Sequence, residues 1–290
     1  MVTPCEAVLQ HFGVHLVSPL GGRRNQHWQV ASDRDSLILR RWAGDAADIE
    51  YELRLLTHIK ALGWPVAAGI DEPIFLQDAF WSLFPLLPGT PRPTHGAPTE
   101  QRARGNLLAR FHSDLSQIKG FEQRGAWRRC EQILGDETTD ALLADYEAQS
   151  PDEAYILRWH LDRARKRING LSLADKPGSI VHGDFTAWNL LYVGERLSGV
   201  LDFELSHANH RVADFALSWR GKYDQVIHGY NDVSPLAQEE WTLLTPAWWA
   251  FLIELACRHI SEGTPLDGWI VEKILGRSPL MGVDAAEFQR

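Results

Sequence analysis

The chain has 290 residues, of which 44% are hydrophobic, and this is enough for a large core or for two lobes. Its formal net charge of −9 disfavours a nucleic-acid partner, because such partners usually bind a basic face. The charge could steer a cationic substrate or simply keep the protein in solution. Residues 1–6 lack signal-peptide features, no apolar run is long enough for a transmembrane helix, and the three cysteines are scattered. The sequence therefore predicts a cytoplasmic protein without a membrane partner.

The first part of the chain predicts an antiparallel sheet with helices. An amphipathic helix pattern covers residues 5–17, and Gly21 and Gly22 form a turn after the first strand. The strands after this turn are expected at residues 28–30, 36–40, 74–76 and 81–87, with a helix at 48–62. Prolines from Pro85 to Pro93 then break regular structure. They mark the boundary between a first lobe, residues 1–88, and a second lobe, residues 89–290.

The second part is mainly helical. Apolar positions four residues apart predict a helix over residues 99–118, and a second helix is expected at 155–168. Residues 120–140 show no clear period, so no element is predicted there. A short strand at 179–181 and a hairpin around Gly194 precede a helical region from about 212 to 276.

The most informative motif begins at His182-Gly183-Asp184 and continues to Asn189, with Asp202 after the second hairpin strand. Kinases of the protein-kinase type use one Asp as base and hold magnesium with an Asn and another Asp. Asp184 is therefore the candidate base that orients and deprotonates an accepting hydroxyl. Asn189 and Asp202 offer the oxygen ligands that Mg²⁺ prefers, and the hairpin should return Asp202 to the vicinity of Asn189.

Other interpretations of these residues remain. His-Gly-Asp alone could be an ordinary turn, and His182 more often braces such a loop than takes part in chemistry. Asp214 is expected to anchor the loop by accepting hydrogen bonds from the backbone or from a histidine. A metal-hydrolase site is disfavoured, because the histidines do not form the clusters that softer metals need.

With these motifs, the chain resembles the aminoglycoside phosphotransferase and choline kinase superfamily. The resemblance rests on the catalytic segment and on Asp202-Phe203-Glu204, a form that is typical of its small-molecule kinases. It implies an α+β, two-lobed protein-kinase-like fold, with an N-terminal antiparallel sheet plus helix and a mainly helical C-terminal lobe. It also implies an ATP- and Mg²⁺-dependent phosphotransferase that moves the γ-phosphoryl group to a hydroxyl of a small molecule. Glu204 could reach a second metal, contact a cationic substrate or have a structural role.

The resemblance also implies residues for nucleotide binding. Gly21, Gly22 and Asn25 would form a loop over the ATP phosphates, although an ordinary hairpin turn remains an alternative. The hinge segment, residues 81–88, should line the adenine slot, with Phe84 or Leu86 giving the apolar contact.

A basic residue of the third strand contacts phosphates in this family and pairs with a helix acid. The matching position is Arg40, where the family has Lys, and the two are not interchangeable because Arg is a planar fork. Its expected partner is Glu52, with Glu50 as the fallback. The alternatives are a surface strand residue for Arg40 and a solvated helix carboxylate for Glu52. Arg41 should point to the opposite face of the sheet, since strand side chains alternate.

The acceptor is not fixed by these motifs. Aromatic and acidic residues of the helical part would suit an amine-bearing alcohol, so an aminoglycoside, an amino alcohol and homoserine are all candidates. A catalytically inactive nucleotide-binding scaffold is the competing class, supported by Arg40 and the sparse glycines. A protein-substrate kinase is disfavoured, because the stretch between Asp202 and Asp214 is too short for a peptide-gripping loop.

Overall fold

The computed structural model describes residues 3–22, 24–121, 124–125, 127–173, 178–282 and 287–288. The chain divides into two compact units, of which the first holds Met1–Pro93 and Trp188–Glu204. The second unit holds Thr94–Ala187 and Leu205–Arg290. The expected division into residues 1–88 and 89–290 differs from this, because the chain returns to the first unit for the catalytic hairpin.

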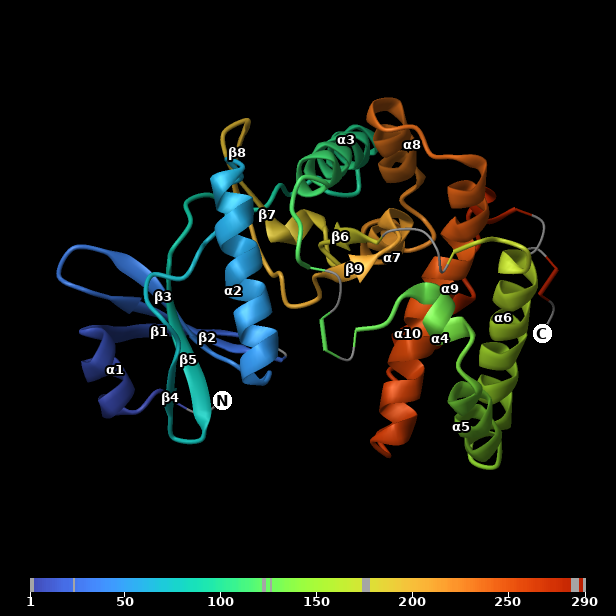
Figure 1. Ribbon diagram of the computed structural model, residues 1–290, viewed down its shortest axis with the longest axis horizontal. Helices are drawn as coiled ribbons and strands as arrows, with labels where there is room; N and C mark the ends of the chain where they lie inside the picture. Colours follow the sequence, from blue (N-terminus) through green and yellow to red (C-terminus); the bar gives the residue numbers. More distant parts are fainter. Residues whose placement is uncertain are drawn as a thin grey trace. The chain divides into compact units, whose positions relative to one another are not determined.

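A five-stranded antiparallel sheet forms the centre of the first unit (Figure 1). Its strands lie in the order β1-β2-β3-β5-β4, and all neighbouring pairs are antiparallel. The strands are β1 (His15–Gly21), β2 (Gln26–Ala31), β3 (Ser36–Arg41), β4 (Ile74–Leu76) and β5 (Ala79–Pro85). The N-terminal antiparallel sheet expected from the sequence is therefore confirmed.

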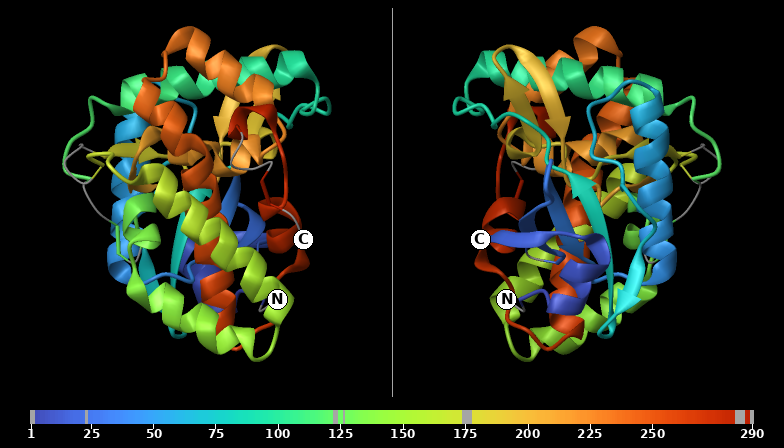
Figure 2. Two further views of the ribbon diagram at one scale, coloured as in Figure 1. Left: turned by 90° about the vertical axis from the view of Figure 1, so that its right-hand side faces the viewer. Right: turned by 90° about the vertical axis from the view of Figure 1, so that its left-hand side faces the viewer.

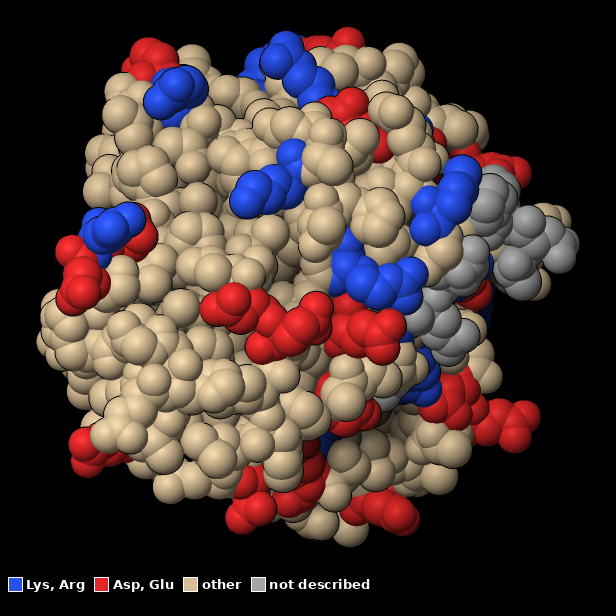
Figure 3. All heavy atoms as spheres, turned by 60° about the vertical axis from the view of Figure 1, so that its left-hand side comes forward, with Lys and Arg blue, Asp and Glu red and all other residues tan. Residues whose placement is uncertain are grey.

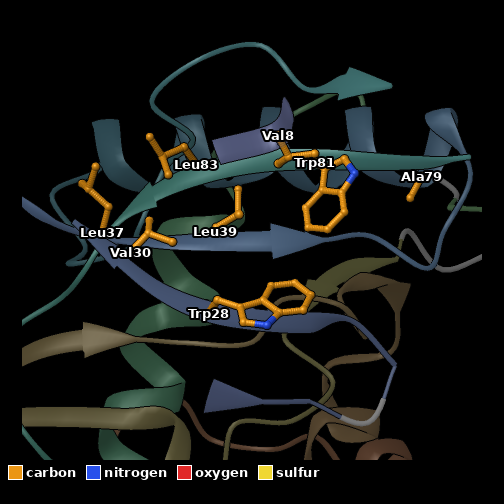
Figure 4. Close-up of a cluster of buried hydrophobic side chains, with 8 residues drawn as sticks. All are labelled: Val8, Trp28, Val30, Leu37, Leu39, Ala79, Trp81 and Leu83. Atoms are coloured by element: carbon orange, nitrogen blue, oxygen red, sulfur yellow. The ribbon is translucent and has the colours of Figure 1, made fainter. Parts of the chain in front are cut away.

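One face of this sheet carries a hydrophobic core (Figure 4). Trp28 and Trp81 lie with ring centroids 5.6 Å apart, and Leu39 of β3 is fully buried beside them. Val8 of the helix α1 (Glu6–Phe12) joins the same cluster. A helix of this length is unstable by itself, so burial of its apolar side, worth about 1.5–3 kcal/mol for a side chain such as Val8, holds it on the sheet.

The first helix is shorter than the sequence predicts. The helix pattern extends to residue 17, but α1 ends at Phe12 because Gly13 adopts a left-handed conformation with φ 61°. Its N–H closes the helix by donating to the carbonyl of Gln10. The next residues, including β-branched Val14 and Val17, lead into and form β1.

The opposite face of the sheet meets the helix α2 (Ala46–Ala61). Asp45 caps this helix by accepting a hydrogen bond from the backbone N–H of Asp48 at 2.9 Å. The sequence therefore places the start of α2 two residues too late. Its buried side includes Glu52, a position that reaches Arg40 on β3.

The predicted hairpin is present as β7 (Leu190–Val193) and β8 (Arg196–Val200). Isolated bridges join Val66 to Val200 and Thr90 to Tyr192, and the hydroxyl of Ser198 donates to the carbonyl of Pro88 at 2.6 Å. These bonds attach the hairpin to neighbouring segments of the first unit. They explain why the hairpin belongs to the first unit although its sequence lies within the second half of the chain.

The second unit is mainly helical, as expected, and also contains a small sheet (Figure 1). Its helices are α3 (Pro98–Leu115), α4 (Cys130–Leu134), α5 (Glu137–Glu147), α6 (Pro151–Ile168), α7 (Phe215–Trp219), α8 (Asp224–Val233), α9 (Gln238–Ser261) and α10 (Gly268–Ile274). The short strands β6 (Ser179–Val181) and β9 (His207–Asn209) pair antiparallel. The 3₁₀ turns η2 (Arg211–Asp214) and η3 (Pro279–Met281) also belong to this unit, whereas η1 (Ala187–Asn189) lies where the chain passes into the first unit.

Helices α3 and α8 lie side by side in both views of the second unit (Figures 1 and 2). Two glycines allow this close approach: a Cβ on Gly105 would lie 1.9 Å from the carbonyl oxygen of Val226, and one on Gly229 would lie 2.1 Å from that of Arg102. The pair positions the end of α3, where Nε2 of His112 lies 2.8 Å from the carboxylate of Asp214.

The segment from 120 to 150 holds helices that the sequence pattern does not reveal. Helix α4 is too short to show a period, and the buried residues of α5 are only Thr139 and Leu143. Asp136 caps α5 by accepting from the N–H of Thr138. Helix α6 begins at Pro151, four residues before the predicted start, since proline is well suited to a first helical turn.

Figure 3 shows one face of the molecule on which acidic and basic side chains lie close to one another, with large areas that carry neither. Although the net charge is −9, this face is therefore not uniformly acidic. Ligand recognition has to be argued from individual contacts instead.

Candidate functional site

A pocket of about 410 Å³ lies beside the face of the sheet that carries Arg40, and we call it the sheet pocket. It is lined by the first unit alone, from β1, β2, β3, α2, the end of β5 and the base of the hairpin. The residues named from the sequence that line it are Gly21, Gly22, Arg40, Glu52, Phe84, Leu86, Asn189 and Asp202. The fold thus brings together residues that are far apart in the chain.

Arg40 and Glu52 form a buried ion pair in this pocket. Nη1 of Arg40 donates to Oε1 of Glu52 at 2.6 Å, and the side chains are only 9% and 1% exposed. The guanidinium carbon lies 3.7 Å from the centre of the Trp42 ring, and this cation–π contact further restrains the guanidinium group of Arg40. The fallback partner, Glu50, is 71% exposed and faces Arg54 at 3.9 Å instead. The structure therefore pairs Arg40 with Glu52.

The glycine turn covers one end of the sheet pocket. Gly22 has φ 131°, and a Cβ there would lie 1.8 Å from the carbonyl oxygen of Asn25, so only glycine fits. Asn25 itself is outside the pocket lining. Its amide donates to Glu204 at 2.6 Å and its oxygen accepts from the N–H of Ala43 at 2.9 Å. The side chain expected over the phosphates ties the turn to the residues after Asp202.

His27 is a pocket residue that sequence reasoning missed. It lies directly opposite Arg40 in the β2–β3 register, and it lines the sheet pocket beside the glycine turn. Burial, together with the positive charge of Arg40, lowers its pKa from 6.5 to about 4. His27 is consequently neutral near pH 7. The alternation of side chains along β2 could have placed it on this face, but no motif drew attention to it.

The base of the hairpin places two oxygen-bearing side chains in the sheet pocket. The backbone N–H of Leu201 donates to the carbonyl of Asn189 at 2.8 Å. The hairpin therefore brings the chain around Asp202 close to Asn189, as the sequence predicts. Asp202 has φ 66°, a left-handed conformation that is uncommon outside glycine and often occurs at functional sites. An amide oxygen and a carboxylate are the donor set that suits Mg²⁺.

Apolar side chains form another wall of the sheet pocket. Phe84 of β5 lies opposite Ile38 of β3, and both belong to the lining. Leu86 follows, 43% exposed at the surface yet also part of the lining. Both hinge residues named from the sequence therefore lie where an apolar ring could contact them.

The catalytic loop follows β6 in the second unit and carries Asp184. Nδ1 of His182 accepts a hydrogen bond from the backbone N–H of Asp184 at 3.2 Å, so the loop turns around this fully buried ring. Gly183 has φ 85°, and a Cβ there would lie 2.6 Å from Leu205. These contacts give His182 the bracing position that the sequence analysis assigned to it.

Asp214 anchors this loop from η2. Its carboxylate accepts from the backbone N–H groups of His182 and Gly183, both at 2.7 Å, and from Nε2 of His112 at 2.8 Å. Complete burial would raise its pKa, but the hydrogen bond and charge of His112 and the amide of His182 outweigh burial and lower it. Asp214 thus remains ionised and holds the backbone of the two residues immediately before Asp184.

His112 is a second residue that the sequence did not single out. Its Nδ1 lies 2.9 Å from the hydroxyl of Tyr230 on α8, while Nε2 faces Asp214. The helix α3 thereby connects α8 to the catalytic loop. The sequence did hold one indication of its role: His112 is a polar residue next to Phe111 in a helix with a buried apolar stripe, and a buried polar group needs a hydrogen-bond partner.

Comparison with known proteins gives the family. A family model described as "Phosphotransferase enzyme family" matches residues 15–237, which include the sheet pocket and the catalytic loop. The chain belongs to this family. It is a small-molecule kinase, a phosphotransferase with an alcohol group as acceptor, as the resemblance of its motifs implied.

Two relatives are homoserine kinases. The protein of Hyphomonas neptunium is 26% identical over 246 residues, which cover 74% of this chain and 71% of the relative. That of Zymomonas mobilis is 27% identical over 275 residues, covering 87% and 83%. Among solved structures, the aminoglycoside phosphotransferase APH(4)-Ia in complex with ADP and hygromycin B has a TM-score of 0.67 at 15% identity, covering 98% of this chain and 99% of that chain. This likeness confirms the kinase-like fold.

Among the described residues, no helix combines the length and the apolar character that a membrane-spanning helix requires.

Proposed function

We propose that this enzyme moves the γ-phosphoryl group of ATP, together with Mg²⁺, to the hydroxyl of homoserine. The observation that carries the proposal is that both relatives described above are homoserine kinases that align along most of the chain. The likeness to aminoglycoside phosphotransferases supports the fold alone, because the sequence identity is only 15%. An aminoglycoside is therefore the weaker candidate for the acceptor.

The sheet pocket suits the nucleotide. The backbone at Gly21 and Gly22 and the charge of Arg40 would hold the phosphates, since Arg binds phosphate oxygens through charge-assisted hydrogen bonds. Asn189 and Asp202 would hold Mg²⁺, which neutralises charge on the phosphates when it is bound. The apolar wall of the pocket offers a surface for the adenine ring.

Asp184 is the proposed base. Its carboxylate would accept the proton of the acceptor hydroxyl while that oxygen attacks the γ-phosphorus, and ADP leaves with the electron pair of the broken bond. The loop around Asp184 is fixed by His182 and Asp214, so the base is oriented before substrate arrives. Positioning of this kind accounts for much of catalysis in phosphoryl transfer.

The proposal is tested by an acceptor panel with Mg-ATP. Homoserine, choline, ethanolamine and hygromycin B are each incubated with the enzyme, and ADP release and the mass of the product are measured against a reaction without acceptor. Phosphorylation of homoserine at the highest kcat/KM is expected. Preference for another member of the panel contradicts the homoserine proposal. Binding of Mg-ATP without phosphorylation of any acceptor would favour the inactive-scaffold alternative.

A further inference from the structure

A second, smaller cavity lies entirely in the second unit and adjoins the catalytic loop; we call it the helical pocket. Gly183, the residue immediately before Asp184, is part of its lining. The remaining walls come from α4 and the segment before it, from β6, β9 and η2, from Leu205 and from one side of α9. Its volume is about 50 Å³, against about 410 Å³ for the sheet pocket. Such a space holds a few water molecules or a compact polar group.

A stack of rings makes one wall of the helical pocket rigid. Trp127 lies against His207, with ring centroids 5.5 Å apart and planes 22° from parallel. Nδ1 of His207 lies 2.7 Å from the carbonyl of Leu205, and Nε2 lies 3.0 Å from the amide of Asn209. Burial lowers the pKa of His207, so this ring is neutral and already has partners at both nitrogens. It serves as a wall rather than as a charged contact.

The Trp127 ring also contacts a cation. The guanidinium carbon of Arg258, on α9, lies 4.8 Å from the ring centroid. Nε and Nη2 of Arg258 donate to Oε1 of Glu254 at 3.3 and 3.2 Å. Within the described part of the chain, no hydrogen bond occupies Nη1. The Arg258 side chain is 39% exposed, so a ligand can reach it.

Glu254 lies between two arginines of the lining. It pairs with Arg128 as well as with Arg258, and its own side chain is only 14% exposed. Arg128 also pairs with Asp136, which lies outside the lining, and these two carboxylates hold it in place. The charged lining residues are two arginines and one glutamate, and with Asp136, which pairs with Arg128, the charges of this cluster balance. A zwitterion, which brings one charge of each sign, would leave that balance unchanged.

From this arrangement we propose that the helical pocket binds the amino-acid head of the acceptor, with its carboxylate on Arg258 and its ammonium group on Glu254. The inference rests on the proposed function, because it assumes an acceptor that is an α-amino acid with a side-chain hydroxyl. Opposite charges on one face of α9 match the two charges of a zwitterion. The small volume excludes a multi-ring aminoglycoside from this cavity and admits an amino-acid head.

The experiment compares two acceptors that differ only in the carboxylate. Homoserine and 3-aminopropan-1-ol, which is homoserine without its carboxylate, are assayed with the wild type and with Arg258→Gln. The expected result is a loss of about 10- to 100-fold in kcat/KM for homoserine, mainly through KM, since a charge-assisted hydrogen bond is removed. Activity on 3-aminopropan-1-ol should change less than about threefold by the same reasoning. Arg258→Lys keeps the charge and should lose less than Arg258→Gln.

Arg158→Gln is the matched control. Arg158 lies on α6 of the same unit and forms an exposed pair with Glu147, outside the helical pocket. Calorimetric binding of Mg-ATP and the melting temperature show whether each variant is folded, and Arg258→Met, which also removes the charge, replaces Arg258→Gln if the latter is not. Equal effects of Arg258→Gln and Arg158→Gln on homoserine would overturn the pocket assignment and leave the proposed function standing. Absence of homoserine turnover by the wild type would overturn both.

Discussion

Replacing Glu52 by Gln removes the negative partner of Arg40 while it keeps the size of the side chain. Arg40 is buried, so the substitution leaves a desolvated positive charge without compensation. Breaking a buried ion pair costs about 3–5 kcal/mol, and we expect the lower end, about 3 kcal/mol, because Gln still offers an oxygen to Nη1. With an unfolding entropy of about 2.1 cal/mol/K per residue, this corresponds for a chain of 290 residues to a fall in melting temperature of about 5 °C.

Urea denaturation, followed by tryptophan fluorescence, measures the loss. Glu50→Gln is the matched control, because Glu50 lies on the same helix but is exposed, and its change should stay within about 0.5 kcal/mol. Saturation with Mg-AMP-PNP should reduce the loss in Glu52→Gln, since phosphates placed beside Arg40 supply the missing negative charge. The double variant Arg40→Met/Glu52→Leu should be more stable than Glu52→Gln alone. Equal stability of the Glu52 and Glu50 variants would refute the buried-pair reasoning.

Three further predictions concern the catalytic loop and the sheet pocket. Asp214→Asn should destabilise the protein by about 2–4 kcal/mol, because several buried donors lose a charged acceptor, and thermal unfolding would detect this. Gly183→Ala should cost about 2–4 kcal/mol and lower kcat, since its φ of 85° and the nearby Leu205 leave no room for Cβ; an unchanged melting curve would contradict this. The folded protein binds a proton at His27 only near pH 4, but the unfolded chain does so near 6.5, so this contribution to stability is complete above pH 6.5 and is lost as the pH falls toward 4. His27→Gln should therefore flatten the acid side of a stability–pH profile, and a profile identical to that of the wild type would argue against it.

The sequence was most informative where function depends on local spacing. Asp184 and Asn189 lie in one short segment, and the hairpin signal at Gly194 was enough to place Asp202 beside Asn189. The position of Arg40 followed from its place at the end of a strand. These predictions needed no knowledge of contacts between distant parts of the chain.

Contacts between distant residues were beyond the reach of the sequence pattern. Asn25 has the position expected for a loop over phosphates, yet its amide is bound to Glu204, 179 residues away. His112 contacts Asp214, which lies 102 residues later in the chain, and neither the spacing of the histidines nor the periodicity predicts such a pair. Trp127 precedes the short helix α4 in a segment without a period, so the wall of the helical pocket could not be predicted either.

The central claim is that Asp184 activates the hydroxyl of homoserine for attack on Mg-ATP. The most direct measurement is side-by-side phosphorylation of homoserine by the wild type and Asp184→Asn, with Mg-ATP binding measured by calorimetry on the same samples. We expect equal amounts of ADP and phosphorylated homoserine from the wild type. For Asp184→Asn we expect a fall in kcat of at least about 100-fold, with the Kd for Mg-ATP changed by little. Turnover of the variant at the wild-type rate would show that Asp184 is not the base.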